Sequence, residues 1–109
     1  MVDVEVHPIS VDGESFMSVQ VKLPKTTLLT IQCDNGYVMC GALDILLLRT
    51  KLADRGIVAA RATGVRTMEE LLNGTVESCT QAAETIGIEP GLPIKDALLK
   101  MKAAHNPNQ

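Results

Sequence analysis

The sequence predicts an α+β domain, with two N-terminal β-hairpins and a fifth strand in a mixed sheet, packed with three to four helices from the C-terminal half. The first half alternates apolar and polar residues around glycine-containing turns, which is the period of half-buried strands. The second half repeats apolar residues at helical spacing behind capping residues. We expect one domain, with a β-hairpin region over 1–42, a helical part with one strand over 43–102 and a frayed tail over 103–109.

The first hairpin is predicted from its turn and its alternation together. Asp12-Gly13 is typical of a two-residue hairpin turn, and apolar residues alternate with polar ones on both sides of it. The register that follows pairs Val4 with Val21, Val6 with Val19 and Asp3 with Lys22. Pro8 has no amide hydrogen, so it indicates a sheet edge or a bulge.

A second hairpin is predicted around Asn35-Gly36. This turn would place Cys33 opposite Val38 and make Cys40 only its diagonal neighbour, at roughly 7 Å, which is too far for a relaxed disulfide. One face of the hairpin is apolar and is expected to be buried; it consists of Leu29, Ile31, Cys33, Val38, Cys40 and Ala42.

The second half is predicted to contain helices around one buried strand. The strand covers residues 57–63 and joins the fourth strand through a helical crossover, so the sheet is mixed. Asp44 is expected to be the N-cap of a helix that ends at Arg55, and Thr67 forms a capping box with Glu70 at the start of a second helix. Thr75 is expected to be the N-cap of a helix over 76–87, and Pro93 opens the last helix.

Composition excludes several classes of function. A net charge of −3 and 2% aromatic residues argue against nucleic-acid binding. No apolar run is long enough to span a membrane, and the acidic, alternating N-terminus is unlike a signal peptide, so we expect a cytoplasmic protein with no membrane partner. The three cysteines lack CxxC spacing and the two histidines stand far apart, which indicates reduced thiols, no metal and no cofactor.

The apolar content predicts self-association. Hydrophobic residues make up 46% of a chain that has one Tyr, one Phe and no Trp, so the core must be aliphatic. So much aliphatic surface on a small domain suggests that other subunits cover part of it.

Several stretches together resemble a known family. They are "LPKT" (23–26), "GYVMCGALD" (36–44), "LADRGIVAARATGVRTMEELLN" (52–73) and the "GI" that closes the next predicted helix. They are similar to the YunC-like domain of unknown function, a small family of bacterial and archaeal proteins, over roughly residues 12–88. The resemblance implies an N-terminal β-rich region that drives tetramer formation, and it implies no established activity and no catalytic residue.

Cys40 is the candidate nucleophile. If a helix begins near Asp44, the thiol lies close to its positive end, where a thiolate is favoured. The alternative is a small buried residue, because Cys40 belongs to the apolar hairpin face and no histidine is placed to act as its base.

Arg61 and Arg66 are the candidate anion ligands. A strand, a turn at Gly64 and a helix start flanked by two arginines make a plausible anion site, with the Gly41 backbone and Lys25 of the "LPKT" loop as further contributors. The alternative is that the arginines pair with carboxylates. The candidates are Asp44, which counts first as an N-cap, Asp54 and Glu69.

Three hypotheses follow for the function. The first is an oligomeric protein that binds a small anionic metabolite through Arg61 and Arg66. The second is an enzyme of acyl-transfer or thiol chemistry that uses Cys40. The third is a purely structural or partner-binding tetramer.

Overall fold

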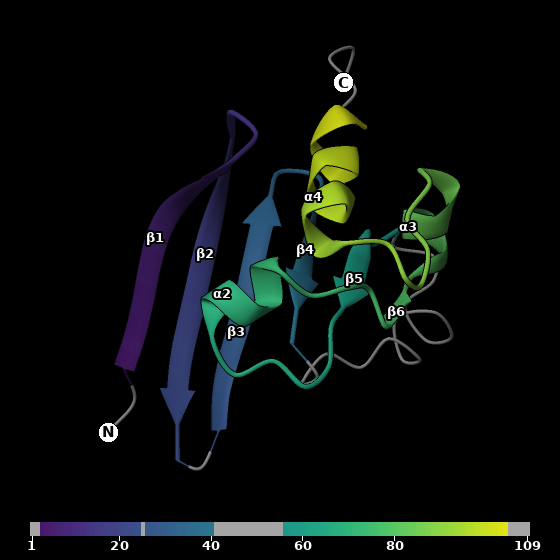
Figure 1. The fold of residues 1–109 in the computed structure, drawn as a ribbon. Helices are drawn as coiled ribbons and strands as arrows, with labels where there is room; N and C mark the ends of the chain where they lie inside the picture. Colours follow the sequence, from purple (N-terminus) through teal and green to yellow (C-terminus); the bar gives the residue numbers. More distant parts are fainter. Residues whose placement is uncertain (1–2, 25, 41–55, 105–109) are drawn as a thin grey trace.

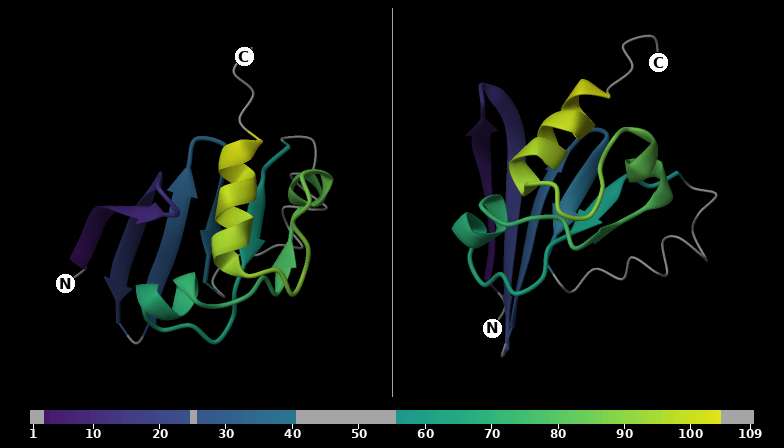
Figure 2. Two further views of the ribbon diagram at one scale, coloured as in Figure 1. Left: turned by 45° about the horizontal axis from the view of Figure 1, so that its top comes forward. Right: turned by 45° about the vertical axis from the view of Figure 1, so that its right-hand side comes forward.

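The computed structural model describes residues 3–24, 26–40 and 56–104. Within them, six strands form one sheet in chain order, and three helices lie on one of its faces (Figures 1 and 2). In chain order the elements are β1 (Asp3–Val11), β2 (Glu14–Leu23), β3 (Thr26–Cys33), β4 (Gly36–Met39), β5 (Ala59–Arg61), α2 (Met68–Leu72), β6 (Ser78–Cys79), α3 (Gln81–Thr85) and α4 (Ile94–Ala103). The predicted α+β fold with a mixed sheet is confirmed, with a sixth strand added. The predicted helix after Asp44, along with Lys25, Gly41 and the tail from 105, lies outside the described residues.

The first hairpin has the predicted turn and register. Asp12 and Gly13 both have positive φ, 49° and 84°, as a two-residue turn of this handedness requires. Val4 lies opposite Val21 and Val6 opposite Val19. Pro8 stands opposite Met17 in continuous pairing, so it marks an edge strand rather than a bulge, and β1 is an edge of the sheet.

The second hairpin turns one residue earlier than predicted. Asp34 and Asn35 form the turn, so Cys33 lies opposite Gly36, and the predicted pairing of Cys33 with Val38 is wrong. Gly36 is needed in the strand instead, because a Cβ there would collide with the carbonyl oxygen of Val58. The pairing moves by two residues, which leaves the faces unchanged. The predicted face residues Leu29, Ile31, Val38 and Cys40 are all buried, and no disulfide joins Cys33, Cys40 and Cys79 to one another.

The strand predicted over 57–63 is shorter than expected and has a neighbour that was not predicted. β5 pairs in parallel with β4 and antiparallel with β6. The predicted helix over 76–87 is therefore wrong in its first half, and Thr75 forms a bridge with Pro93 rather than a cap. The cap is Thr80, whose hydroxyl oxygen accepts a hydrogen bond from Ala83 N.

The helices supply the cover of the core. In α4, which begins after Pro93 as predicted, the buried residues repeat at the spacing of one helical face and pack against β3 and β4; they are Ile94, Ala97, Leu98 and Met101. α2 begins with the predicted cap, in which Thr67 Oγ1 accepts from Glu70 N at 3.1 Å. The Glu70 carboxylate accepts from Arg66 N rather than from Thr67 N, which shifts the capping box by one residue.

Candidate functional site

Cys40 is packed as a core residue. Its side chain is 6% exposed. Leu29 N donates to the Cys40 sulfur at 3.5 Å, and the thiol points at the carbonyl oxygen of Thr27 at 3.9 Å. The thiol therefore faces the backbone of β3, an arrangement that fits packing better than attack on a substrate. The predicted helix start that would activate it, with Gly41 and Asp44, lies outside the described residues.

Arg61 is engaged by a carboxylate. Its Nη2 and Nε lie 2.8 and 2.9 Å from Glu77 Oε1, and the Ser78 hydroxyl donates to the same oxygen at 2.6 Å. The hydrogen bond from Ser78, followed by that from Arg61, lowers the pKa of Glu77. The guanidinium is thus held in an internal ion pair, as the alternative interpretation expected.

Sequence reasoning missed Glu77 as the partner of Arg61. It named Asp44, Asp54 and Glu69 instead, because Glu77 stood inside the predicted helix over 76–87. β6 places the two residues side by side, since Arg61 is paired with Ser78. The signal that was available is the group of polar residues Glu77, Ser78 and Thr80 around a single cysteine, which is atypical of a buried helix.

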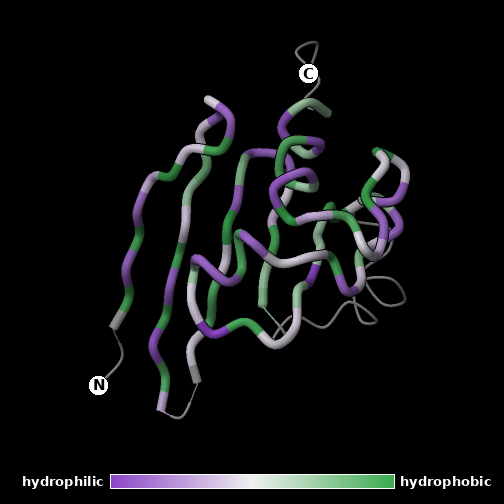
Figure 3. The backbone as a smooth tube through the Cα atoms, in the orientation of Figure 1, coloured by the Kyte–Doolittle hydropathy of each residue, from purple (hydrophilic) through white to green (hydrophobic). Residues whose placement is uncertain are grey.

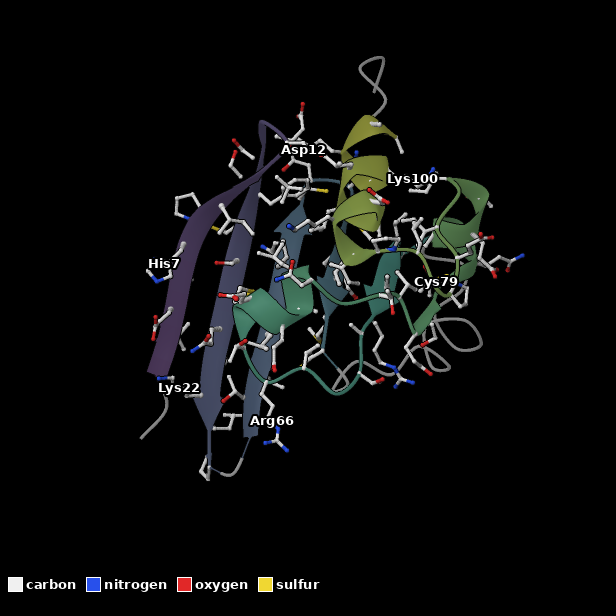
Figure 4. The ribbon with its side chains drawn as sticks, in the orientation of Figure 1. His7, Asp12, Lys22, Arg66, Cys79 and Lys100 are labelled. Atoms are coloured by element: carbon white, nitrogen blue, oxygen red, sulfur yellow. The ribbon has the colours of Figure 1, made fainter. Side chains whose placement is uncertain are left out.

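Arg66 stands apart from Arg61. The segment after β5 runs through Gly64, at φ 75°, and leads to α2, which packs near β3 rather than beside β5 (Figure 1). Arg66 is exposed, and its side chain extends downwards in the view of Figure 4, at the lower end of the molecule. The start of α2 is also occupied by its own acidic residues, Glu69 and Glu70. Nothing in this arrangement draws the two guanidinium groups together around one anion.

One hollow of the described surface lies away from both arginines. It has a volume of about 470 Å³ and lies between the tip of the first hairpin and α4, lined by Asp12, Glu14, Leu99, Lys102 and Ala103. Lys102 Nζ donates to Ser15 O at 3.0 Å and lies 5.6 Å from the centre of the Phe16 ring, so the ammonium group already has partners within the fold. Among the described residues, no three His, Cys, Asp or Glu side chains are grouped to hold a metal ion.

The feature that stands out is an exposed apolar surface on the first hairpin. Val4, Val6 and Met17 are 60%, 53% and 37% exposed. Strand pairing puts them on the sheet face opposite the helices, together with three further residues. We call this surface the β1–β2 patch; it comprises Val4, Val6, Pro8, Met17, Val19 and Val21.

The alternation that produces the patch is visible along both strands (Figure 3). The other face of the same hairpin carries Glu5, His7 and Gln20, and His7 points to solvent at the edge (Figure 4). Sequence reasoning found the alternation and the aliphatic excess, but it did not locate the excess on this face. That location depends on which side the helices cover.

Comparisons with known proteins place the chain in a family. The family profile described as "Domain of unknown function (DUF1805)" matches residues 39–101, more than half of the chain. The chain therefore belongs to this family. It is 53% identical over 98 residues to the uncharacterised protein YunC of Bacillus subtilis, covering 90% of this chain and 97% of that one. The predicted resemblance to YunC-like proteins is confirmed.

A solved structure supports the fold. The crystal structure of TA1206, a protein of unknown function from Thermoplasma acidophilum, superposes with a TM-score of 0.81 at 27% identity, covering 92% of this chain and 94% of that one. None of these names states an activity or a ligand. In the described part of this chain, every helix is too short or too polar to cross a membrane.

Proposed function

We propose that the protein is a homotetramer in which the β1–β2 patch forms one of the subunit interfaces, and that it serves as a structural or partner-binding assembly. The observation that carries this proposal is the exposure of Val4, Val6 and Met17 on the face that the described helices leave uncovered. An exposed apolar surface rimmed by polar residues is typical of a subunit interface.

The energetic argument rests on symmetry. Burying a valine side chain completely stabilises by about 1.5–3 kcal/mol, so burying the exposed half of Val6 gives roughly 1 kcal/mol. In a two-fold interface the same patch contributes from both subunits, so every such contact counts twice. The six apolar residues of the patch then offset part of the translational and rotational entropy that the subunits lose when they associate.

The test is the mass in solution with two matched variants. Light scattering after gel filtration should give four times the chain mass of 11.7 kDa for the unmodified protein. Val6→Lys places a charge in the patch and should give smaller species. His7→Lys places the same charge one residue later, on the opposite face, and should leave the mass unchanged. A protein that is monomeric at micromolar concentration, or a tetramer indifferent to Val6→Lys, contradicts the proposal.

The other two hypotheses receive less support from the geometry. Anion binding by Arg61 and Arg66 stays a prediction, with Arg61 held by Glu77 and Arg66 apart from it. Catalysis by Cys40 also stays a prediction, and its buried thiol argues for packing.

A further inference from the structure

We infer that Pro8 blocks the free edge of the sheet and thereby directs subunits to meet face to face through the β1–β2 patch, instead of adding strand to strand. The inference rests on the proposed self-association. It names the residue that prevents the oligomer from growing further by strand pairing. The direction in which each residue of β1 forms its backbone hydrogen bonds supports it.

The direction follows from the two-residue turn. Val11 and Glu14 close that turn, so they exchange hydrogen bonds, and every second residue of β1 does the same with β2. The residues that bond to β2 are thus Asp3, Glu5, His7, Ile9 and Val11. The backbone groups of Val4, Val6, Pro8 and Ser10 point the other way, to the free edge.

Two hydrogen bonds agree with this assignment. The Ser18 hydroxyl donates to His7 O at 3.0 Å, so this carbonyl faces β2. Carried across β2 and β3, the same alternation makes Leu29 bond towards β4. Cys40 N indeed donates to Leu29 O at 3.0 Å.

Without Pro8, the free edge of β1 could form backbone hydrogen bonds with a strand of another chain. It is nine residues long, and an unpaired strand of that length is a template for pairing with a second chain. Pro8 stands near its middle at an outward position. It offers no N–H to a neighbouring strand, and its ring occupies the space that the neighbour's carbonyl oxygen would need.

The position of Pro8 costs the hairpin nothing. One residue earlier or later, a proline would remove a hydrogen bond to β2, whereas here the missing donor faces outwards. The ring also adds apolar surface to the β1–β2 patch, since Pro8 shares its face with Val6 and Met17. A single residue therefore closes the edge and extends the face.

The opposite edge of the described sheet is protected from strand pairing because its strand, β6, is very short. β6 has only two residues, Ser78 and Cys79, and α3 follows almost at once. Short edge strands resist pairing for lack of successive hydrogen bonds. In the described part of the chain, both sheet edges are thus closed to strand pairing, whereas the β1–β2 patch stays open to contact with another copy.

The experiment restores the missing donor. Pro8→Val keeps an apolar side chain in the patch and adds the N–H, and we expect at least a doubling of the weight-average mass over that of the unmodified protein, growing with concentration. Ser10→Val is the matched control, because it adds the same side chain at the next outward position of the same strand and changes no backbone donor. It should leave the mass unchanged.

Two outcomes overturn the inference. One is a Pro8→Val protein with the mass of the unmodified protein, and the other is equal growth in Ser10→Val, which would assign the effect to hydrophobicity. Circular dichroism checks folding, and Pro8→Thr, which restores the donor with a more polar side chain, is measured if Pro8→Val does not fold. The readout is a ratio of masses, so it remains separate from the proposed function, which fails if the unmodified protein is a monomer.

Discussion

The three cysteines differ in exposure, and that difference tests the catalytic hypothesis residue by residue. Cys33 is partly exposed beside a surface hollow, whereas Cys40 and Cys79 are buried. The thiol of Cys79 points at Ile88 O at 3.5 Å. Burial of Cys40 is the alternative that the alternation of the second hairpin predicted.

We therefore expect iodoacetamide to modify Cys33 at least about tenfold faster than Cys40 or Cys79 in the native protein, because a buried thiol reacts only after local opening. Mass spectrometry of the digested protein gives the three rates, and the same reaction in concentrated urea should make them equal. Fast, selective modification of Cys40 would restore the nucleophile hypothesis.

At the scale of elements, Thr80 joins β5, β6 and α3. Its hydroxyl donates to Ile57 O at 2.6 Å and accepts from Ala59 N at 3.1 Å and Ala83 N at 3.3 Å. The side chain is buried, so these backbone groups have little access to water. The residue thus fixes the short strand and caps the helix with one oxygen atom.

Thr80→Val should lower the free energy of unfolding by about 2–4 kcal/mol, since it removes the cap and leaves the buried Ala59 N without that acceptor. Thr80→Ser keeps the hydroxyl and should cost about 1 kcal/mol, for the lost methyl group. Urea unfolding followed by circular dichroism measures both. Equal losses in the two variants would show that the hydroxyl contributes little.

The elements also show what local sequence signals can predict. The first hairpin was predicted in full, because Asp12-Gly13 and the alternation around it act between neighbours in the chain. The predicted turn of the second hairpin was one residue too late, because Gly36 is required in the strand by its close approach to Val58, which is distant in sequence. β6 was missed because a two-residue strand exists only through its pairing with β5. The Arg61–Glu77 pair was lost with it, so half of the candidate site could not be predicted.

At the scale of the molecule, alternation alone leaves open which face of a hairpin is covered. α2, α3 and α4 lie on one side of the sheet, and this placement turns the apolar face of β1 and β2 outwards (Figure 2). Pro8 stands at the edge of the same hairpin. The exposed β1–β2 patch and the edge closed by Pro8 together favour an oligomer of fixed size over open-ended strand pairing.

Subunit association should be coupled to folding, and the melting temperature should then depend on concentration. For a tetramer that unfolds to separate chains, raising the concentration about a hundredfold stabilises each chain by about 2 kcal/mol through mass action, which raises the melting temperature by roughly 10 °C for a domain of this size. Differential scanning fluorimetry across that range measures the shift. Val6→Lys should flatten the dependence and His7→Lys should retain it, because only Val6 faces the patch. A melting temperature independent of concentration in the unmodified protein would mean that each chain folds without help from its neighbours.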